Sequence, residues 1–298
     1  MLETTIDNTA ILISHKIVRY KDFSKRFTEL LDELGILWKY ADYTNDIWIR
    51  DFMPIELDDC TFLKYRYFPD YLRDDKDYMK TITDCAQLCK EFRIEYQETD
   101  IILDGGNVTP CGDYYVLTDK IFAENNRQKG DKALIAKLEK LLKRKVIIIP
   151  WHLIIQEDDP DGEYADVFGH SDGFIHWCGG NKVLMSNHRD TDPDEADEIK
   201  RILESYGFEV TEMLFNVRKP EPLWNWAYVN YIKVGNRIIM PAFGIEEDNQ
   251  ALKYVKEANP DCIIRQIRMR DIADKGGALH CITWDYTVSP EQLADYKQ

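Results

Sequence analysis

The chain has 298 residues, and 44% of them are hydrophobic, which is enough for a substantial core and too many for a disordered protein. Its 54 acidic and 38 basic residues give a formal net charge of −16. Such a surface should repel nucleic acids and anionic membranes and attract small cations. No apolar run approaches the roughly 20 residues that cross a bilayer, so the sequence predicts neither a nucleic-acid-binding nor a membrane-spanning protein.

A short strand followed by a helix recurs along the chain, and several helices lead into a second strand. Apolar residues at helical spacing, bounded by capping and turn residues, mark the helices. We expect first strands at 11–17, 61–68, 114–122, 182–188 and 237–244, helices at 21–35, 76–92, 131–145, 192–207 and 247–260, and second strands that include 146–150 and 262–269.

The first and fourth helices carry the clearest end signals. Asp22 is placed to cap the start of the first helix, and Gly35 is placed to end it. Pro193 stands in the first turn of the fourth helix, where its missing N–H does no harm. The five units recur every 50 to 65 residues or so, and no linker separates them, which predicts five repeated modules in one domain over residues 1–298.

The cysteines indicate free thiols. Their number is odd, no CxxC pair occurs, and Cys85 and Cys89 should pack on one face of a helix. This pattern is typical of a reducing compartment and not of a disulfide framework or a zinc ribbon. The N-terminus has no basic segment followed by an apolar stretch, so we expect a cytoplasmic protein. The seven positions are Cys60, Cys85, Cys89, Cys111, Cys178, Cys262 and Cys281.

The acidic loop at 156–166 has part of the pattern of a calcium-binding loop. Its acidic residues match the start of an EF-hand, but Phe168 stands where the bidentate glutamate belongs. We therefore expect a solvated loop that attracts cations without a dedicated site.

A polar cluster follows every unit at a similar offset. If the modules are related by rotation about one axis, these five chain segments converge on its centre and build one pocket. In chain order the clusters are "DIWIRDF" with Asp51, "DIILDGGN" with Asp104, "FGHSDGF" with His170 and Asp172, "WNWAYVNY" with Asn230, and "GGALHCITW" with Cys281.

Cys281 is the candidate nucleophile. An isolated cysteine is more often a structural core residue, but Gly276 and Gly277 strip side chains from the preceding backbone, so that a ligand or another segment can approach. A thiolate that neighbouring groups stabilise is a strong nucleophile. In this context we interpret Cys281 as catalytic.

His170 and Asp172 form the second strong candidate. In an extended segment both would project to one side, where an imidazole can move protons and a carboxylate can hold a cation. His280 should point away from the site if its own segment is extended, so it receives no role. His170, His176 and Cys178 do not have the spacing of zinc ligands.

The remaining motifs are weak when taken alone. Asp51 either pairs with Arg50 at a strand end or faces the pocket, where Trp48 would offer an aromatic wall to a planar cation. Asp104 precedes a glycine pair that reads as a turn. Asn230, expected within a strand, is a polar residue in an aromatic run and requires a partner.

The ordered set "WIRD", "DGGN", "GHSDG", "AYVNY" and "GGALHCIT" resembles the guanidino-group-modifying enzymes of the pentein fold, closest to the agmatine deiminase and bacterial peptidylarginine deiminase branch. The resemblance spans most of the chain. It implies an α/β propeller of five modules with pseudo-fivefold symmetry, a small guanidino substrate, and no metal or organic cofactor. It admits a homo-oligomer, which the sequence does not decide.

The resemblance also implies residue roles. Cys281 would attack the guanidinium carbon, His170 would act as acid and base, and Asp51 and Asp172 would hold the nitrogens. The substrate pocket would be lined by Trp48, Asp104, Asn107 and Asn230.

Two departures from the family pattern bear on these roles. Asp104 stands where the family often has glutamate, and a tryptophan-rich N-terminal motif of many agmatine deiminases is missing. Agmatine remains the first expectation for the substrate. Free or C-terminal arginine would require a cation for its carboxylate, and Arg66 or Arg73 would be available to supply it.

The sequence thus predicts a deiminase that converts a guanidino group to a ureido group plus ammonia through a covalent amidino-cysteine intermediate. Three alternatives stay open: an amidinotransferase of the same fold, a non-catalytic pentein relative that acts as a binding protein, and a metal-binding or structural protein. The presence of Cys281, His170 and both aspartates disfavours the second.

Overall fold

The computed structural model describes residues 8–58, 61–73, 75–153, 168–219, 224 and 226–296. Cys60 lies outside the described residues, and so does the acidic loop at 156–166 that was expected to be solvated. Within the described residues, no helix is long and apolar enough to cross a membrane.

Five three-stranded sheets make up the framework, one for each predicted module. In every sheet the middle strand pairs antiparallel with one neighbour and parallel with the other. The sheets, in strand order, are β15 (Thr283–Thr287), β1 (Thr9–Ser14) and β2 (Leu37–Ala41); β3 (Ile55–Asp58), β4 (Thr61–Arg66) and β5 (Tyr96–Ile102); β6 (Thr109–Cys111), β7 (Tyr114–Thr118) and β8 (Lys145–Ile149); β9 (Ile175–Gly179), β10 (Lys182–Met185) and β11 (Glu209–Glu212); β12 (Ile232–Val234), β13 (Arg237–Ala242) and β14 (Ile263–Arg268).

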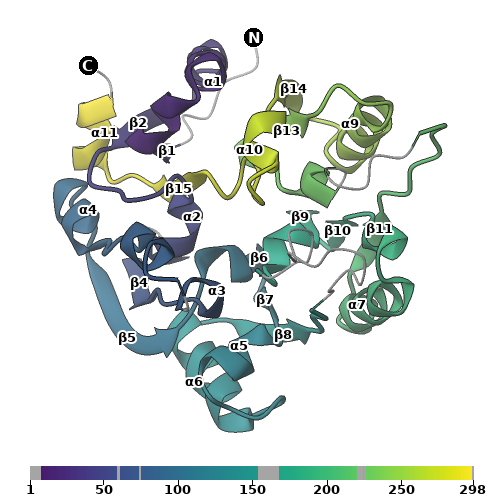
Figure 1. The fold of residues 1–298 in the computed structure, drawn as a ribbon, viewed down its shortest axis with the longest axis horizontal. Coiled ribbons are helices and arrows are strands. Elements are labelled where there is room, and N and C mark those ends of the chain that lie inside the picture. The colour runs from purple at the N-terminus through teal and green to yellow at the C-terminus, as the bar shows by residue number, and fades with distance from the viewer. Residues whose placement is uncertain are drawn as a thin grey trace.

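One main helix per module connects the two parallel strands, and Figure 1 shows these helices on the perimeter of the molecule. They are α1 (Lys21–Glu33), α4 (Ala86–Glu91), α6 (Lys132–Leu142), α7 (Pro193–Ser205) and α9 (Glu247–Ala258). Shorter helices fill the connections: α2 (Ile49–Phe52), α3 (Asp70–Arg73), α5 (Lys120–Glu124), α10 (Arg270–Ala273), α11 (Pro290–Tyr296), and the 3-10 turns η1 (His15–Arg19), η2 (Tyr78–Thr81), η3 (Gly105–Asn107), η4 (Ser171–Gly173), η5 (His188–Asp190) and η6 (Trp226–Val229).

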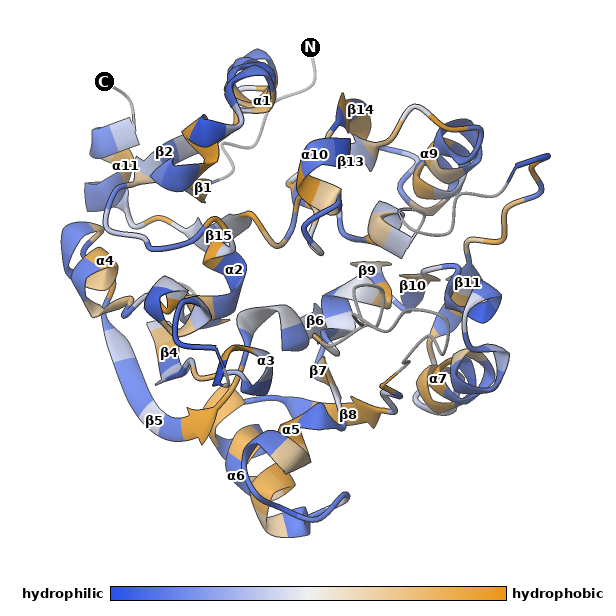
Figure 2. Ribbon diagram, viewed as in Figure 1, coloured by the Kyte–Doolittle hydropathy of each residue, from blue (hydrophilic) through white to orange (hydrophobic). Residues whose placement is uncertain are grey.

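Each main helix buries an apolar face against its sheet and leaves charged residues outside, as Figure 2 shows for α1 and α7. In α1, Phe23, Phe27 and Leu31 are buried at helical spacing. In α7 the buried set includes Ile199 and Leu203. This is the amphipathic pattern that predicted the helices from the sequence.

The ring of modules closes through β15, which pairs with β1 from the other end of the described chain (Figure 1). Leu12 faces Trp284 in this register. Trp284 is 2% exposed, and its indole donates a 2.8 Å hydrogen bond to the carbonyl of Pro54, which precedes β3. One side chain therefore connects the closing strand to the next module.

Several sequence expectations need correction. The segment 76–92 is no continuous helix, because the Asp84 carboxylate accepts the Ala86 N–H and starts α4 late. The strand expected at 114–122 ends at Thr118, and α5 follows. Asp22 lies inside the first turn of α1 and does not cap it.

Other expectations are confirmed. Gly35 follows α1 with φ +63°, a conformation that favours glycine at a helix end. Pro193 occupies the first turn of α7, which Asp192 caps through a 2.9 Å bond from the Glu195 N–H. Cys85 and Cys89 are both buried and pack in one core cluster.

Candidate active site

Each predicted polar cluster stands just before the edge strand that pairs antiparallel with the middle strand of its sheet, which is β3, β6, β9, β12 or β15. The side chains that the clusters contribute come together. Asp51 precedes β3, Asn107 precedes β6, His170 and Asp172 precede β9, and Asn230 precedes β12, while Cys281 precedes β15. All six are buried, with at most 8% exposed. Because these strands are equivalent in their modules, equivalent ends meet at the middle of the ring.

His170 lies between two carboxylates. Its Nε2 is 2.9 Å from Asp104 Oδ2, and its Nδ1 is 3.7 Å from Asp51 Oδ1. Burial disfavours the charged ring, but the charge of Asp51 and the hydrogen bond to Asp104 outweigh it and raise the pKa of His170 to about 9. At neutral pH the ring is therefore an imidazolium that can donate a proton. The hydrogen bond to Asp104 also fixes the orientation of the ring.

Asp51 is a buried acid with an unused acceptor. Burial and the neighbouring charges of Asp104 and Asp172 raise its pKa to about 7 against the opposing charge of His170. Its Oδ1 has no hydrogen-bond partner among the described residues, and neither does Asp104 Oδ1. Unpaired buried acceptors are costly, so this arrangement suits a ligand that brings N–H donors.

Asp172 is bonded to His280, which the sequence placed on the far side. Residues 279–282 form a turn and not an extended strand, so the His280 ring reaches back, and its Nδ1 lies 2.6 Å from Asp172 Oδ2. Asp172 itself sits in η4, not in an extended segment. The position of His280 directly before Cys281 was the available signal in the sequence. It was set aside because the segment was expected to be an extended strand.

Cys281 is held by Asn230. The Asn230 amide oxygen accepts bonds from the N–H groups of His280 at 3.0 Å and Cys281 at 3.3 Å, and lies 3.4 Å from Cys281 Sγ. Its amide nitrogen donates to the Asp172 carbonyl at 3.2 Å. Asn230 precedes β12 and does not lie within a strand, so it joins the nucleophile's turn to the loop that carries Asp172.

The surroundings of Cys281 disfavour ionisation of its thiol. Burial, together with the charges of Asp172 and Asp51, raises its pKa well above the ordinary value. These two acids therefore act on the sulfur electrostatically. A cation placed between them would reverse that effect and favour the thiolate.

Two glycines permit the close packing of the site. A Cβ on Gly106 would lie 2.7 Å from His170 Nδ1 and 2.9 Å from Asp51 Oδ1. A Cβ on Gly277 would lie 2.2 Å from the ring of Trp48. The glycine pair before Cys281 thus makes room for aromatic rings, and it places the partly buried Trp48 against the nucleophile's loop.

Asn107 acts on the backbone of the site. Its amide oxygen accepts the N–H groups of Thr118 at 2.8 Å and Ser171 at 3.3 Å, which fixes the residue after His170. Its amide nitrogen is buried without a hydrogen-bond partner in the described part of the chain.

An aromatic and basic cluster that was not predicted from the sequence lies beside His170. The Tyr71 ring lies 6.2 Å from the His170 ring and 5.0 Å from the Phe168 ring. Lys120 is buried below Tyr71 and bonds the Phe168 carbonyl at 2.8 Å and Asp70 at 2.9 Å. Nothing in the local sequence predicts this cluster, because its members come from three separate segments.

The arginines singled out from the sequence have other contacts. Arg50 pairs with Asp285 and not with Asp51. The guanidinium groups of Arg66 and Arg73 each lie about 5 Å from the Phe68 ring centre, and Arg73 also donates to the Phe68 carbonyl. No contact of either side chain with the catalytic residues is present among the described residues.

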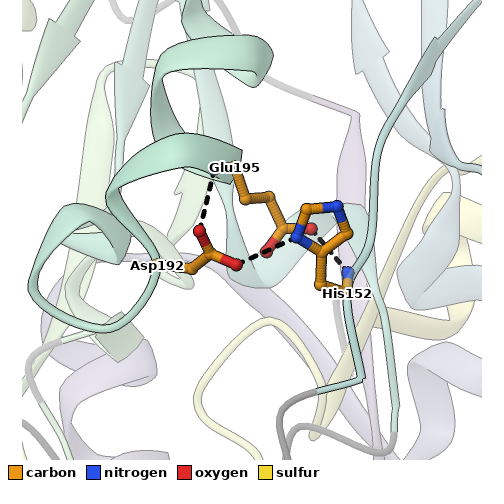
Figure 3. Close-up of side chains that lie close together, drawn as sticks. All are labelled: His152, Asp192 and Glu195. Carbon is orange, nitrogen blue, oxygen red and sulfur yellow. Dashed lines mark hydrogen bonds and ion pairs between the residues drawn. The ribbon is translucent and has the colours of Figure 1, made fainter.

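Figure 3 shows a separate group, His152, Asp192 and Glu195, whose ligand atoms lie within 4.8 Å of one another. It joins the segment after β8 to the start of α7. Each of its ligand atoms already has a protein partner: His152 Nδ1 meets Asp192 Oδ2 at 2.9 Å, and Glu195 accepts the His152 N–H at 2.6 Å and faces His188 at 2.5 Å. This hydrogen-bond network accounts for the group as a helix anchor.

Known proteins match the chain along most of its length. A family model described as Porphyromonas-type peptidyl-arginine deiminase matches residues 10–286. The agmatine deiminase of Stutzerimonas stutzeri is 25% identical over 287 residues, which covers 80% of this chain and 74% of that protein. A protein of Mycoplasma capricolum subsp. capricolum, provisionally named as an agmatine deiminase, is 27% identical over 230 residues, or 66% of this chain and 60% of that protein.

The solved structure of the C. jejuni agmatine deiminase superposes with a TM-score of 0.71 at 18% identity, covering 94% of this chain and 93% of that one. This likeness confirms the five-module α/β propeller of the penteins that the sequence predicted. The family model runs from the first strand to the closing one, and the chain therefore belongs to the Porphyromonas-type peptidyl-arginine deiminase family.

Proposed function

We propose that the chain is a deiminase that hydrolyses the guanidino group of a small cationic substrate to a ureido group and ammonia. The observation that carries the proposal is the buried group of Cys281, His170, Asp51 and Asp172, in which one acid oxygen, Asp51 Oδ1, accepts no hydrogen bond from the described residues. A guanidinium is planar, cationic and rich in N–H donors, so it supplies what these acids lack.

The chemistry follows from the charges of the site. When the substrate cation binds between Asp51 and Asp172, the Cys281 thiol releases its proton to solvent, and the cation stabilises the resulting thiolate and orients the guanidinium carbon towards it. Thiolate attack gives a tetrahedral adduct, the His170 imidazolium protonates one amino group, and ammonia leaves. His170, now neutral, takes a proton from water, which attacks the amidino carbon, and collapse of this second adduct releases the ureido product and the thiolate.

Agmatine is the substrate that we propose first. The relatives described above include proteins named as agmatine deiminases, and the family model is named for peptidyl-arginine. We propose one domain over residues 1–298, a cytoplasmic location in which the six described cysteines stay as free thiols, and the residue roles set out above.

A ureido-product screen over agmatine, arginine, arginine peptides and methylated arginines tests the activity. We expect product and ammonia from agmatine without any added amine. Product formation that depends on an amine acceptor would favour the amidinotransferase, and no turnover of any compound would leave a binding protein.

The nucleophile is tested by Cys281→Ala, with Cys262→Ala as the matched control, because Cys262 lies outside the site and is partly exposed. We expect Cys281→Ala to fold normally and lose turnover, while Cys262→Ala keeps it. Turnover near the wild-type level in Cys281→Ala would refute the covalent mechanism.

The two acids are tested by Asp51→Asn and Asp172→Asn, with the exposed Asp100→Asn as control. Each active-site variant should lose at least about 100-fold in kcat/KM, because a buried charge contact with the substrate is removed. A loss below about threefold in both variants would show that the substrate binds elsewhere.

A further inference from the structure

His280 is a partly buried polar residue that the chemistry above does not use. Its side chain is 17% exposed, and its Nδ1 lies 2.6 Å from Asp172 Oδ2. The backbone of His280 is fixed on both sides, because its N–H donates to Asn230 Oδ1 at 3.0 Å and its carbonyl accepts Arg50 Nε at 3.4 Å. The ring is thus aimed at Asp172 by the same turn that carries the nucleophile.

His280 has few ionisable neighbours, and they divide by sign. Asp172 from η4 and Asp285 from β15 are the acids, and the charge of His280 acts to lower the pKa of both. Arg50 from α2 is the permanent cation. His176 from β9 is neutral at neutral pH, because burial and the charge of His280 lower its pKa to about 3.

The two substrate-binding acids consequently differ. Burial works against ionisation of Asp172, but the hydrogen bond from His280 and its charge hold the pKa of this acid below its ordinary value. Asp51 has a pKa of about 7, and its Oδ1 lies 3.7 Å from His170 Nδ1 without a hydrogen bond. Two acids in one small site cannot both ionise without cost. The hydrogen bond from His280 therefore favours ionisation of Asp172 over that of Asp51.

We propose that His280 is a positioning residue that donates its Nδ1–H to Asp172 Oδ2, keeps this acid ionised in the empty site, and leaves its other oxygen for one guanidinium nitrogen. The inference rests on the proposed function, because it assigns Asp172 to substrate binding. It predicts that loss of His280 weakens substrate binding even in a variant that lacks the Cys281 sulfur.

The experiment measures agmatine binding to the non-turnover Cys281→Ala protein by calorimetry between pH 5 and 9. Adding His280→Ala should weaken binding at pH 7 by at least about tenfold and move the acid limb of the affinity profile to higher pH, because Asp172 protonates more easily. Adding His280→Asn should restore part of the affinity at pH 7, since an amide can donate to the same oxygen, while the acid limb stays shifted. Adding His15→Gln, at an exposed histidine, should change neither.

Two outcomes would overturn the inference. Equal affinity and an unchanged acid limb in the His280→Ala background would show that His280 does not act on Asp172. If Cys281→Ala binds neither agmatine nor any other guanidino compound of the screen, the proposed function fails and this inference fails with it. Thermal unfolding of each variant checks the fold, and if His280→Ala does not fold, the acid limb of His280→Asn decides the question.

Discussion

His170 is the residue in which the electrostatics of the site are concentrated, since it neutralises part of a cluster of three buried acids. Its pKa is raised from 6.5 to about 9. A group whose folded pKa lies above its unfolded value contributes stability that is full below about pH 6.5 and is lost as the pH rises through 9. The same proton that the reaction uses therefore helps to hold the fold together.

We expect His170→Gln to be less stable than the wild type at pH 6 and the difference to close by at most about 3 kcal/mol as the pH rises above 9. Urea unfolding at pH 6, 8 and 10 measures it, with His15→Gln as the control. A stability difference that does not change with pH would mean that folding does not raise the pKa of the ring.

At this scale the sequence predicted which side chains meet and missed how some of them are held. Cys281, His170 and the two aspartates carry recognisable motifs, because the chemistry needs those residue types. His280 was placed wrongly, since the orientation of a side chain depends on whether four residues form a turn or a strand. Lys120 and Tyr71 were not predicted, because only the folded ring brings their segments beside His170.

Among the elements, α7 has the best defined start. Asp192 accepts the Glu195 N–H and also holds His152, so one carboxylate caps the helix and anchors it to the segment after β8. Asp192→Ala should lower the free energy of unfolding by about 1–2 kcal/mol. Asp194→Ala, an exposed change in the same first turn, should cost much less. Urea denaturation compares the two, and equal losses would show that no cap was removed.

The same group bears on metal binding. Because each ligand atom of His152, Asp192 and Glu195 is already paired within the protein, we expect EDTA to leave the urea midpoint unchanged. A midpoint that falls on chelation and recovers with added zinc would show that a cation holds α7 in place and that the hydrogen-bond network is secondary.

The longer main helices, α1, α6, α7 and α9, were predictable because each carries an apolar face over about three turns, whereas α4 is shorter than the helix that was expected. The strands that follow the polar clusters, β3, β6, β9 and β15, were not predicted, and β12 was expected only as part of a longer strand around Asn230. β6 and β12 have only three residues each, and such strands are defined by their partners, not by a local pattern. Since the catalytic residues stand directly before these strands, the sequence located the site without locating the elements that position it.

For the whole molecule, stability depends on closure of the ring. Trp284 is buried in β15, stacks on Tyr286 at 4.8 Å, and lies 5.7 Å from Phe62 of the next module. Trp284→Ala should therefore lower the free energy of unfolding by about 3–5 kcal/mol. The partly exposed Trp177→Ala should lower it by clearly less, and chemical denaturation of both variants makes the comparison. Similar losses would mean that closure contributes little beyond local packing.

The fivefold recurrence was visible in the sequence as evenly spaced units, and the spacing of the motifs after them implied a common centre. What could not be predicted is which hydrogen bonds form at that centre. A hydrogen bond such as His170 to Asp104, or Asn230 to Cys281, depends on ångström-scale placement that five modules determine jointly.

The nucleophile stands two residues before the strand that seals the ring, after four modules have already been made. During synthesis the ribosome therefore releases the acids and the imidazole first and the sulfur last. A nascent or prematurely ended polypeptide that lacks Cys281 carries the acids and the imidazole without the sulfur, so the proposed catalytic centre is completed only in molecules in which the ring can close.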